Sequence, residues 1–199
     1  MILVHHRINS IGELKKIPET YGVEVDVRGY GKNLILNHEP LEPGDSLEEY
    51  LKNFHHRFII FNVKEAGIEN AIHELAKKNS IRDYFLLDIE FPYLYKAAET
   101  GERRIAIRYS EQECIETALS FKGKIDWVWI DTITRLPLNP HVVEQLKGFK
   151  TAIVCPERWG RPHDIPQYIE RMKSLNFSPD LVMTSPPYIE IYEQSFLRS

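Results

Sequence analysis

The sequence predicts an α/β protein, a small (β/α)8 TIM barrel whose first helix is trimmed. Two observations support this fold class: short apolar segments recur along the 199 residues, and most are followed by a segment with helical periodicity or a helix cap. Alternating strands and helices are typical of a parallel sheet. At 199 residues the chain is shorter than the roughly 250 residues typical of such barrels. A doubly wound open sheet is the alternative, but the first strand is not followed by the glycine-rich loop of a nucleotide-binding version.

The predicted strands are the apolar segments of the chain, at residues 1–7, 23–28, 58–64, 84–91, 103–110, 125–131, 151–155 and 181–184. Predicted helices follow from caps and periodicity: Ser46 with Glu49 opens one, and Asn139 with Pro140 opens another. Further helices are expected at 67–80, before Gly101, after Ser110 and from Asp164 to Leu175. Residues 8–20 form a link too short and polar for a full helix. The first helix is therefore the element expected to be trimmed.

Composition limits what the protein binds and where it acts. With 43% hydrophobic residues, the chain can bury one core, so residues 1–199 are predicted to form a single domain. A net charge of −4 argues against a nucleic-acid binder. Two cysteines give no disulfide framework and are expected to be reduced and buried, and no apolar run suits a signal peptide or membrane span. We expect a cytoplasmic protein without stable membrane insertion; its oligomeric state does not follow from the sequence.

An acid pair lies in the second predicted strand. Glu24 and Asp26 are two residues apart in a valine-rich run, so both carboxylates project from one face. Like charges this close call for a cation between them or a proton on one of them. Carboxylate oxygens are ligands for hard divalent ions, so the pair predicts a metal site. Ending the first strand, His6 and Arg7 add a proton-transfer group and an anion-binding group, and His38 adds a second proton-transfer group.

Most other predicted strands also end in polar or charged residues. Their set is Asn62, Lys64, Asp88, Glu90, Arg108, Asp131, Glu157 and Thr184. In a (β/α)8 barrel the active site lies where strands end and βα loops begin. This pattern predicts a polar mouth that binds metal and phosphate. Lys64 and Arg108 are candidates for the substrate phosphate, with salt bridges to Asp88 and Glu90 as the alternative.

The ordered set His6-Arg7, Glu24-Val25-Asp26 and His38 resembles the glycerophosphodiester phosphodiesterase family and its phosphatidylinositol-phospholipase-C-like superfamily. Two features depart from that family's pattern. Its Glu-Asn-Thr stretch between the first two motifs is absent, and its Glu-x-Lys on the third strand reads Asn62-Val63-Lys64 here. The third carboxylate is therefore missing from its expected place, and Asn62 or Asp88 would supply the remaining oxygen.

The resemblance implies a metal-dependent hydrolysis of a small glycerophosphodiester-like substrate. Glu24 and Asp26 would hold Mg²⁺ or Ca²⁺, with Asn62 or Asp88 as a further ligand. His6 and His38 would serve as general acid and base, while Arg7, Lys64 and Arg108 would neutralise the phosphate. Two alternatives stay open: a sphingomyelinase-D-like phosphodiester lyase of the same superfamily, which shares the short link, and a non-catalytic barrel that binds a phosphorylated ligand, which Asn62 favours.

Overall fold

A computed structural model describes residues 1–196 of the chain. The chain divides into two compact units, Val4–Ala97 and a second made of Met1–Leu3 with the chain from Ala98 on. The single domain predicted for residues 1–199 stays a prediction. Within the described residues, no helix is both long and apolar enough to cross a membrane.

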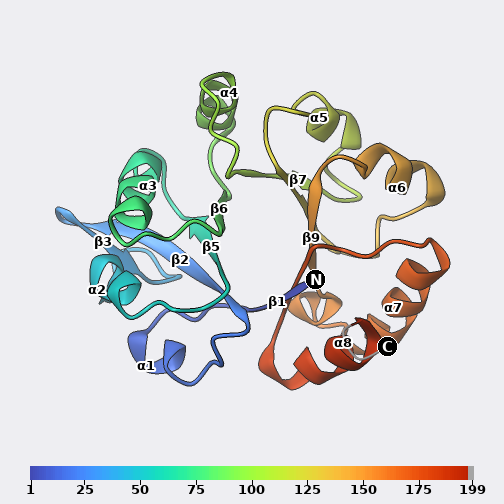
Figure 1. Cartoon of the computed structure of the whole chain (residues 1–199), viewed down its shortest axis with the longest axis horizontal. Coiled ribbons are helices and arrows are strands. Elements are labelled where there is room, and N and C mark those ends of the chain that lie inside the picture. The colour runs from blue at the N-terminus through green and yellow to red at the C-terminus, as the bar shows by residue number, and fades with distance from the viewer. Residues whose placement is uncertain (197–199) are drawn as a thin grey trace. The chain divides into compact units, whose positions relative to one another are not determined.

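The unit Val4–Ala97 is built on parallel strands with a hairpin at one edge. Its elements are β1 (Ile2–His5, which begins in the other unit), α1 (Ile11–Leu14), β2 (Gly22–Tyr30), β3 (Asn33–Leu36), β4 (Asp45–Ser46), α2 (Leu47–Lys52), β5 (Phe58–Val63), α3 (Glu69–Lys78), β6 (Tyr84–Leu87) and α4 (Phe91–Glu99, which continues past Ala97). Parallel pairing joins β1 to β2, β2 to β5 and β5 to β6, while β3 pairs antiparallel with the end of β2. Figure 1 shows α2 and α3 alongside β2, β3 and β5.

The other unit repeats the strand–helix alternation. Its elements are β7 (Ala106–Tyr109), α5 (Ile115–Leu119), β8 (Trp127–Ile130), α6 (Pro140–Leu146), β9 (Lys150–Val154), the 3-10 turns η1 (Pro156–Trp159) and η2 (Pro162–Asp164), α7 (Ile165–Ser174), β10 (Leu181–Thr184), the 3-10 turn η3 (Pro186–Tyr188) and α8 (Ile189–Phe196). Parallel pairing joins β7 to β8, β8 to β9 and β9 to β10. Together with the first unit this is the predicted order of strands and helices, and the α/β fold class is confirmed.

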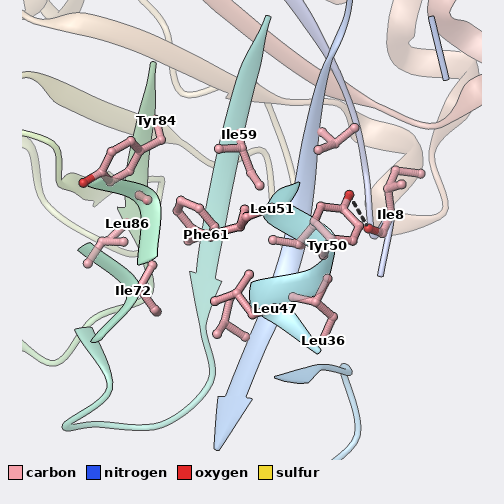
Figure 2. Close-up of a cluster of buried hydrophobic side chains, with 14 of the residues drawn as sticks. Ile8, Leu36, Leu47, Tyr50, Leu51, Ile59, Phe61, Ile72, Tyr84 and Leu86 are labelled. Carbon is pink, nitrogen blue, oxygen red and sulfur yellow. Dashed lines mark hydrogen bonds between the residues drawn. The ribbon is translucent and has the colours of Figure 1, made fainter. Parts of the chain in front are cut away.

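One face of the sheet of Val4–Ala97 packs in a buried apolar cluster, and the opposite face carries polar side chains beside apolar ones such as Ile60. Alternation along β2 and β5 sends one set of side chains into the buried cluster: Val23, Val25, Val27, Ile59, Phe61 and Val63. Leu47, Tyr50 and Leu51 of α2 pack against them, together with Ile72 of α3 (Figure 2). The intervening side chains of β2 and β5 therefore project from the opposite face of the sheet. Glu24, Asp26 and Asn62 belong to that second set.

The predicted trimming of the first helix is confirmed, because α1 has four residues. Its link is held to the rest of the unit by the Tyr50 hydroxyl, which donates to the Ile8 carbonyl at 2.9 Å (Figure 2). In addition, the Ile8 backbone N–H donates to the Glu24 carbonyl at 2.9 Å. A link this short is therefore fixed against β2 at the point where the acid pair begins.

Several local predictions need correction. Gly29 does not end the second strand, because β2 continues to Tyr30 and turns back through Gly31, whose φ of +62° suits the first position of a two-residue hairpin loop. Asp164 makes no capping hydrogen bond to α7; its carboxylate pairs with Arg161 instead.

Of the other candidate helix caps, two are confirmed and one is not. Ser46 and Asn139 cap α2 and α6 as predicted. Ser110 does not cap a helix, because its hydroxyl accepts from the backbone of Gln112 and Glu113 in a turn before α5 begins.

Both cysteines are free, as predicted. Cys155 is buried, but Cys114 is exposed, since it stands at the start of α5 on the surface.

Candidate active site

The acid pair lies on β2, beside the third strand of the parallel set. Asp26 is the register partner of Asn62 on β5, and Glu24 is two residues earlier on the same face. The two carboxylate side chains are almost fully buried, at 1% and 0% exposure. Buried carboxylates need partners, and the neighbouring polar groups supply them.

Glu24 is held by groups from two neighbouring strands. Its Oε2 accepts a hydrogen bond of 2.8 Å from the Arg7 backbone N–H, and its Oε1 accepts one of 2.9 Å from Asn62 Nδ2. His6 Nε2 lies 3.9 Å from Glu24 Oε2. The side chain of Glu24 is thereby fixed in one orientation beside a candidate proton-transfer group.

Arg7 reaches both acids through an unusual backbone conformation. Its φ is +56°, in the left-handed region that side chains other than glycine rarely adopt and that costs on the order of 1 kcal/mol or more. The backbone N–H of Arg7 donates to Glu24, while its side-chain Nε lies 3.9 Å from Asp26 Oδ2. The strained conformation therefore occurs at a residue that contacts both carboxylates, as is common at functional sites.

Asp26 is bound by an amide that sequence reasoning missed. Asn9 Nδ2 donates to Asp26 Oδ2 at 2.8 Å, and Asn9 Oδ1 accepts from the Asp26 backbone N–H at 2.8 Å. Lys64 Nζ lies 3.0 Å from Asp26 Oδ1. The one available signal was the position of Asn9, a polar residue two places after the His6-Arg7 motif and at the entrance to the short link.

Electrostatics separate the two acids. Burial and, after it, the nearby Asp26 carboxylate raise the pKa of Glu24 to about 7, against the weaker lowering effect of its hydrogen bonds from Asn62 and the Arg7 backbone. Burial also acts to raise the pKa of Asp26, but the Asn9 amide and the Lys64 ammonium outweigh it, so that this pKa is lowered. Near neutral pH, Asp26 is therefore ionised while Glu24 exchanges its proton. Two acids two residues apart thus differ in charge because their partners differ.

The two candidate histidines lie on either side of this pair in the sequence. His6 follows β1 directly and is 16% exposed. His38 comes two residues after β3, whose hairpin returns it to the end of β2: the Asn37 backbone N–H donates to the Asp26 carbonyl at 3.0 Å. The positive charge of protonated His38 also contributes to lowering the pKa of Asp26. The hairpin therefore brings His38 near the acid pair.

His38 has a hydrogen-bond partner, Glu39, that determines which ring nitrogen carries the proton. Its Nδ1 lies 2.7 Å from Oε1 of Glu39, whose own pKa is lowered mainly by its hydrogen bond to His38. An ionised carboxylate only accepts, so Nδ1 carries the proton in this bond. Nε2 is then the nitrogen that exchanges protons with other groups. The His38 side chain is 37% exposed.

Asn62 replaces the carboxylate expected from the family motif, and its amide has a defined orientation. Since Nδ2 donates to Glu24, Oδ1 faces away from that acid. This buried oxygen accepts no hydrogen bond from any residue in the described range 1–196. Two carboxylates and an unsatisfied amide oxygen are a donor set suited to Mg²⁺ or Ca²⁺. Glu24, Asp26 and Asn62 therefore fit a divalent ion, with one negative charge fewer than three carboxylates would provide.

Asp88 has a different environment. It follows β6, is exposed and has a φ of +59°. Across residues 1–196, no three side chains from His, Cys, Asp and Glu are grouped to hold a metal ion, so Asp88 does not form a three-acid cluster with Glu24 and Asp26. Its role as a metal ligand stays a prediction.

Lys64 and Arg108 are both engaged by carboxylates. Lys64 pairs with Asp26, and its predicted contact with the substrate phosphate stays a prediction. Arg108 belongs to the other unit, where its NH1 donates to Asp131 Oδ2 at 2.6 Å. Lys64 thus joins the group formed by the acid pair, and Arg108 pairs with Asp131 within its own unit.

Comparison with solved structures identifies the fold. The chain is similar to a glycerophosphodiester phosphodiesterase from Agrobacterium tumefaciens C58, with a TM-score of 0.68, 13% identity and coverage of 98% of this chain and 99% of that one. A second protein of that organism, provisionally named a glycerophosphoryl diester phosphodiesterase, gives a TM-score of 0.70 at 11% identity, over 100% and 99% of the two chains.

A glycerophosphoryl diester phosphodiesterase from Parabacteroides distasonis gives a TM-score of 0.65 at 11% identity, over 98% of this chain and 86% of that one. No family model and no curated protein sequence matches the chain. The likeness to solved structures spans the whole chain and confirms the fold that the motif resemblance implied. The chain has the α/β fold of glycerophosphodiester phosphodiesterases.

Proposed function

We propose that this chain is a phosphoric diester hydrolase acting on a small glycerophosphodiester-like substrate. The observation that carries the proposal is the buried pair Glu24 and Asp26, which is flanked by His6 and Lys64 and lies near His38 on this fold. Burying two acids on one face is costly unless they have a use or a full set of partners. Here a proton or a cation is still needed to balance them, as the raised pKa of Glu24 indicates.

A divalent ion, Mg²⁺ or Ca²⁺, would be held by Glu24 and Asp26, with Asn62 Oδ1 as a neutral ligand and Asp88 as the alternative. When bound, such an ion polarises a phosphate oxygen and offsets charge that grows in the transition state. The protein's own cations add to this effect. Arg7 and Lys64 already lie next to Asp26 and would neutralise the substrate phosphate. The proposal does not use Arg108, which is bound to Asp131.

Proton transfer is proposed for His6 and His38. One imidazole takes a proton from the attacking hydroxyl, which belongs to water or to the substrate, and the other donates a proton to the leaving alcohol oxygen. The bond from His38 Nδ1 to Glu39 supports His38 in this role, because it orients the ring and leaves Nε2 for the reacting oxygen. At His6, Nε2 lies 3.9 Å from Glu24, whose raised pKa allows it to exchange a proton near neutral pH.

A second candidate function, binding of a phosphorylated ligand without turnover, is favoured by one observation. Asn62 donates to Glu24 where the family motif has an acid, which removes a negative charge from the metal site. A lyase of the sphingomyelinase-D type would also use the same residues but release a cyclic phosphate. The identity of the product therefore separates these three functions.

The test is a turnover screen of the purified chain with bis(p-nitrophenyl) phosphate and glycerophosphocholine, with Mg²⁺, with Ca²⁺ and with chelator. We expect metal-dependent release of nitrophenol or choline and an uncyclised phosphomonoester as the final product. His38→Ala should lower the rate about 10²–10⁴-fold, the usual contribution of a general acid or base. Wild-type activity in His38→Ala would remove the mechanism, and ligand binding without any turnover would favour the non-catalytic alternative.

Such a substrate is small and soluble, and we propose that the protein meets it in the cytoplasm. The free state of Cys114 and Cys155 is consistent with a reducing compartment.

A further inference from the structure

Arg28 is the next residue on the acid face of β2. Side chains two apart on a strand project from the same face, so Glu24, Asp26 and Arg28 form one row. On the neighbouring strand β5, Val63 is the register partner of Val27, and Lys64 follows directly after the end of that strand. Arg28 therefore lies at the exit of the hairpin, between the segment that carries His38 and the segment that carries Lys64.

Its guanidinium binds the backbone of both of these residues. Nε and NH2 of Arg28 donate to the His38 carbonyl at 3.2 Å and 2.8 Å, and NH1 donates to the Lys64 carbonyl at 3.4 Å. The side chain of Arg28 is half-buried. A guanidinium presents its N–H groups in a rigid planar fork, so one side chain reaches two carbonyls at once.

We propose that Arg28 is a positioning residue, which fixes the backbone of the proton-transfer residue His38 relative to that of the phosphate-neutralising Lys64. This inference rests on the proposed function for the roles of those two residues. The backbone hydrogen bonds between β2 and the segment after β3 end before His38. The last of them runs from the Asn37 N–H to the Asp26 carbonyl at 3.0 Å. The peptide between His38 and Glu39 is held at its carbonyl by Arg28 and at its N–H by the Asn37 side-chain oxygen, which accepts from the Glu39 N–H at 2.9 Å.

The segment after β5 is fixed more firmly. The Lys64 N–H donates to the Val27 carbonyl at 3.0 Å, and Glu65 Oε1 accepts from the Gly29 N–H at 2.9 Å. Loss of Arg28 should therefore disturb His38 more than Lys64. A displacement of even about 1 Å in a catalytic group is enough to lower a rate about 100-fold.

The kinetic test compares Arg28→Ala, Arg28→Lys and the exposed control Arg82→Ala. We expect Arg28→Ala to lower kcat about 10- to 100-fold with KM changed less than threefold, since the ground-state contacts of the substrate are kept. Arg28→Lys retains the charge and one donor and should recover part of the rate, and Arg82→Ala should match wild type. A change confined to KM would mean that Arg28 contacts the substrate itself and would overturn the proposal.

A double-mutant cycle tests whether Arg28 acts through His38. In the His38→Ala background, adding Arg28→Ala should lower the remaining rate less than twofold, because the group being positioned is already gone. An undiminished 10- to 100-fold loss in that background would show that Arg28 acts independently of His38. Both variants should first be checked for folding by thermal melting, with Arg28→Lys used if Arg28→Ala does not fold.

A readout without turnover separates this inference from the proposed function. In NMR spectra of ring-labelled histidines, Arg28→Ala should shift or broaden the His38 signal and leave that of the exposed His55 unchanged. An unchanged His38 signal would overturn the positioning role even in an active enzyme. If the wild type showed no turnover, the proposed function would fail, while a perturbed His38 signal would still establish the structural contact.

Discussion

The acid pair of Glu24 and Asp26 and the carboxylate of Asp131 both belong to parallel strands, yet their charges are balanced in different ways. Asp131 follows β8 and is neutralised within its own unit: Arg108 donates to Oδ2 at 2.6 Å, while Trp159 Nε1 and the Thr132 N–H each donate to Oδ1 at 2.8 Å. At the acid pair the carboxylate oxygens also have donors, but both cations, Lys64 and Arg7, lie beside Asp26. The pKa of Glu24 rises to about 7, and the amide oxygen of Asn62 is unsatisfied among residues 1–196.

This difference separates structural charges from functional ones. A buried acid with a full set of donors holds its surroundings together and has no remaining need for a ligand. An acid pair in which one member has a pKa raised to near neutral is poised to bind a cation or exchange a proton. A charged residue at a strand end is therefore weak evidence for an active site unless its charge is left partly unbalanced.

The largest expected effect is the loss of activity in Asp26→Ala. Removing this carboxylate should lower kcat/KM on the order of 10³-fold, since about 4 kcal/mol of charge stabilisation in the transition state is lost. Asp131→Ala should change kcat/KM only a few-fold once the folded fraction is taken into account. Steady-state assays on the same diester test both. Equal losses in the two variants would contradict the comparison and would support the predicted role of Arg108 at the substrate phosphate.

The well-balanced site at Asp131 should also contribute measurably to the stability of the fold. Asp131→Ala leaves the Trp159 and Thr132 N–H groups without their acceptor and should lower the free energy of unfolding by about 2 to 4 kcal/mol. The matched control is Arg103→Ala, which breaks a more exposed pair with Asp126 and should cost no more than about 1 kcal/mol. Urea unfolding at one pH measures both. Similar costs for the two variants would mean that Asp131 is not the anchor that its contacts indicate.

The sequence predicted the parts of the site that follow local rules and missed the parts that depend on long-range contacts. Period-two alternation is a local rule, so it correctly put Glu24 and Asp26 on one face, and it also applies to Arg28, which was overlooked. The contacts of Lys64 with Asp26 and of Arg108 with Asp131 were not predicted, because they depend on which strands become neighbours and on side-chain reach; the predicted binding of phosphate by both residues stays a prediction. Asn9 was missed because its contact with Asp26 joins residues 17 apart across the short link.

The fold was predicted for a comparable reason. Eight apolar segments and their caps are local signals that agree with one another, and the long-range pairing follows from the usual connection of parallel strands. The hairpin of β2 and β3 was not predicted: the strand was expected to end at residue 28, whereas β2 continues to Tyr30 and pairs with β3. A glycine within a strand gives no local indication of whether pairing stops there.

The raised pKa of Glu24 makes stability depend on pH in a defined window. Its folded-state pKa of about 7 lies above the ordinary value of 4.5, so its contribution is fully present below pH about 4.5 and is lost as pH rises to about 7. The loss should be on the order of 3 kcal/mol and level off above pH 7. Unfolding of wild type and Glu24→Gln in chelator isolates this group, since other titrations cancel in the difference. A difference that is flat between pH 4.5 and 7 would place the unbalanced charge elsewhere.

The smallest expected effect concerns Asn62. Because its amide oxygen brings no charge, Glu24 and Asp26 alone give the site a charge of −2, and Asn62→Glu would make it −3. We expect this variant to bind Mg²⁺ about tenfold more tightly, a gain of about 1.4 kcal/mol in binding free energy. This gain is smaller than the full Coulomb energy of the added charge. The gain is limited because the new acid also removes the Nδ2 donor of Glu24 and adds a third buried charge in the metal-free state.

The same substitution should therefore destabilise the metal-free protein, so the rise in melting temperature on adding Mg²⁺ should be larger in Asn62→Glu than in wild type. Asp88→Asn is the comparison variant, since it removes the charge of the alternative ligand, an exposed acid one strand away. Isothermal titration of the three proteins decides between the two candidate ligands. A sharp loss of affinity in Asp88→Asn would make Asp88 the third ligand, and unchanged affinity in both variants would leave the ion to Glu24, Asp26 and water. Tighter binding in Asn62→Glu alone would instead show that the amide oxygen at this position faces the ion.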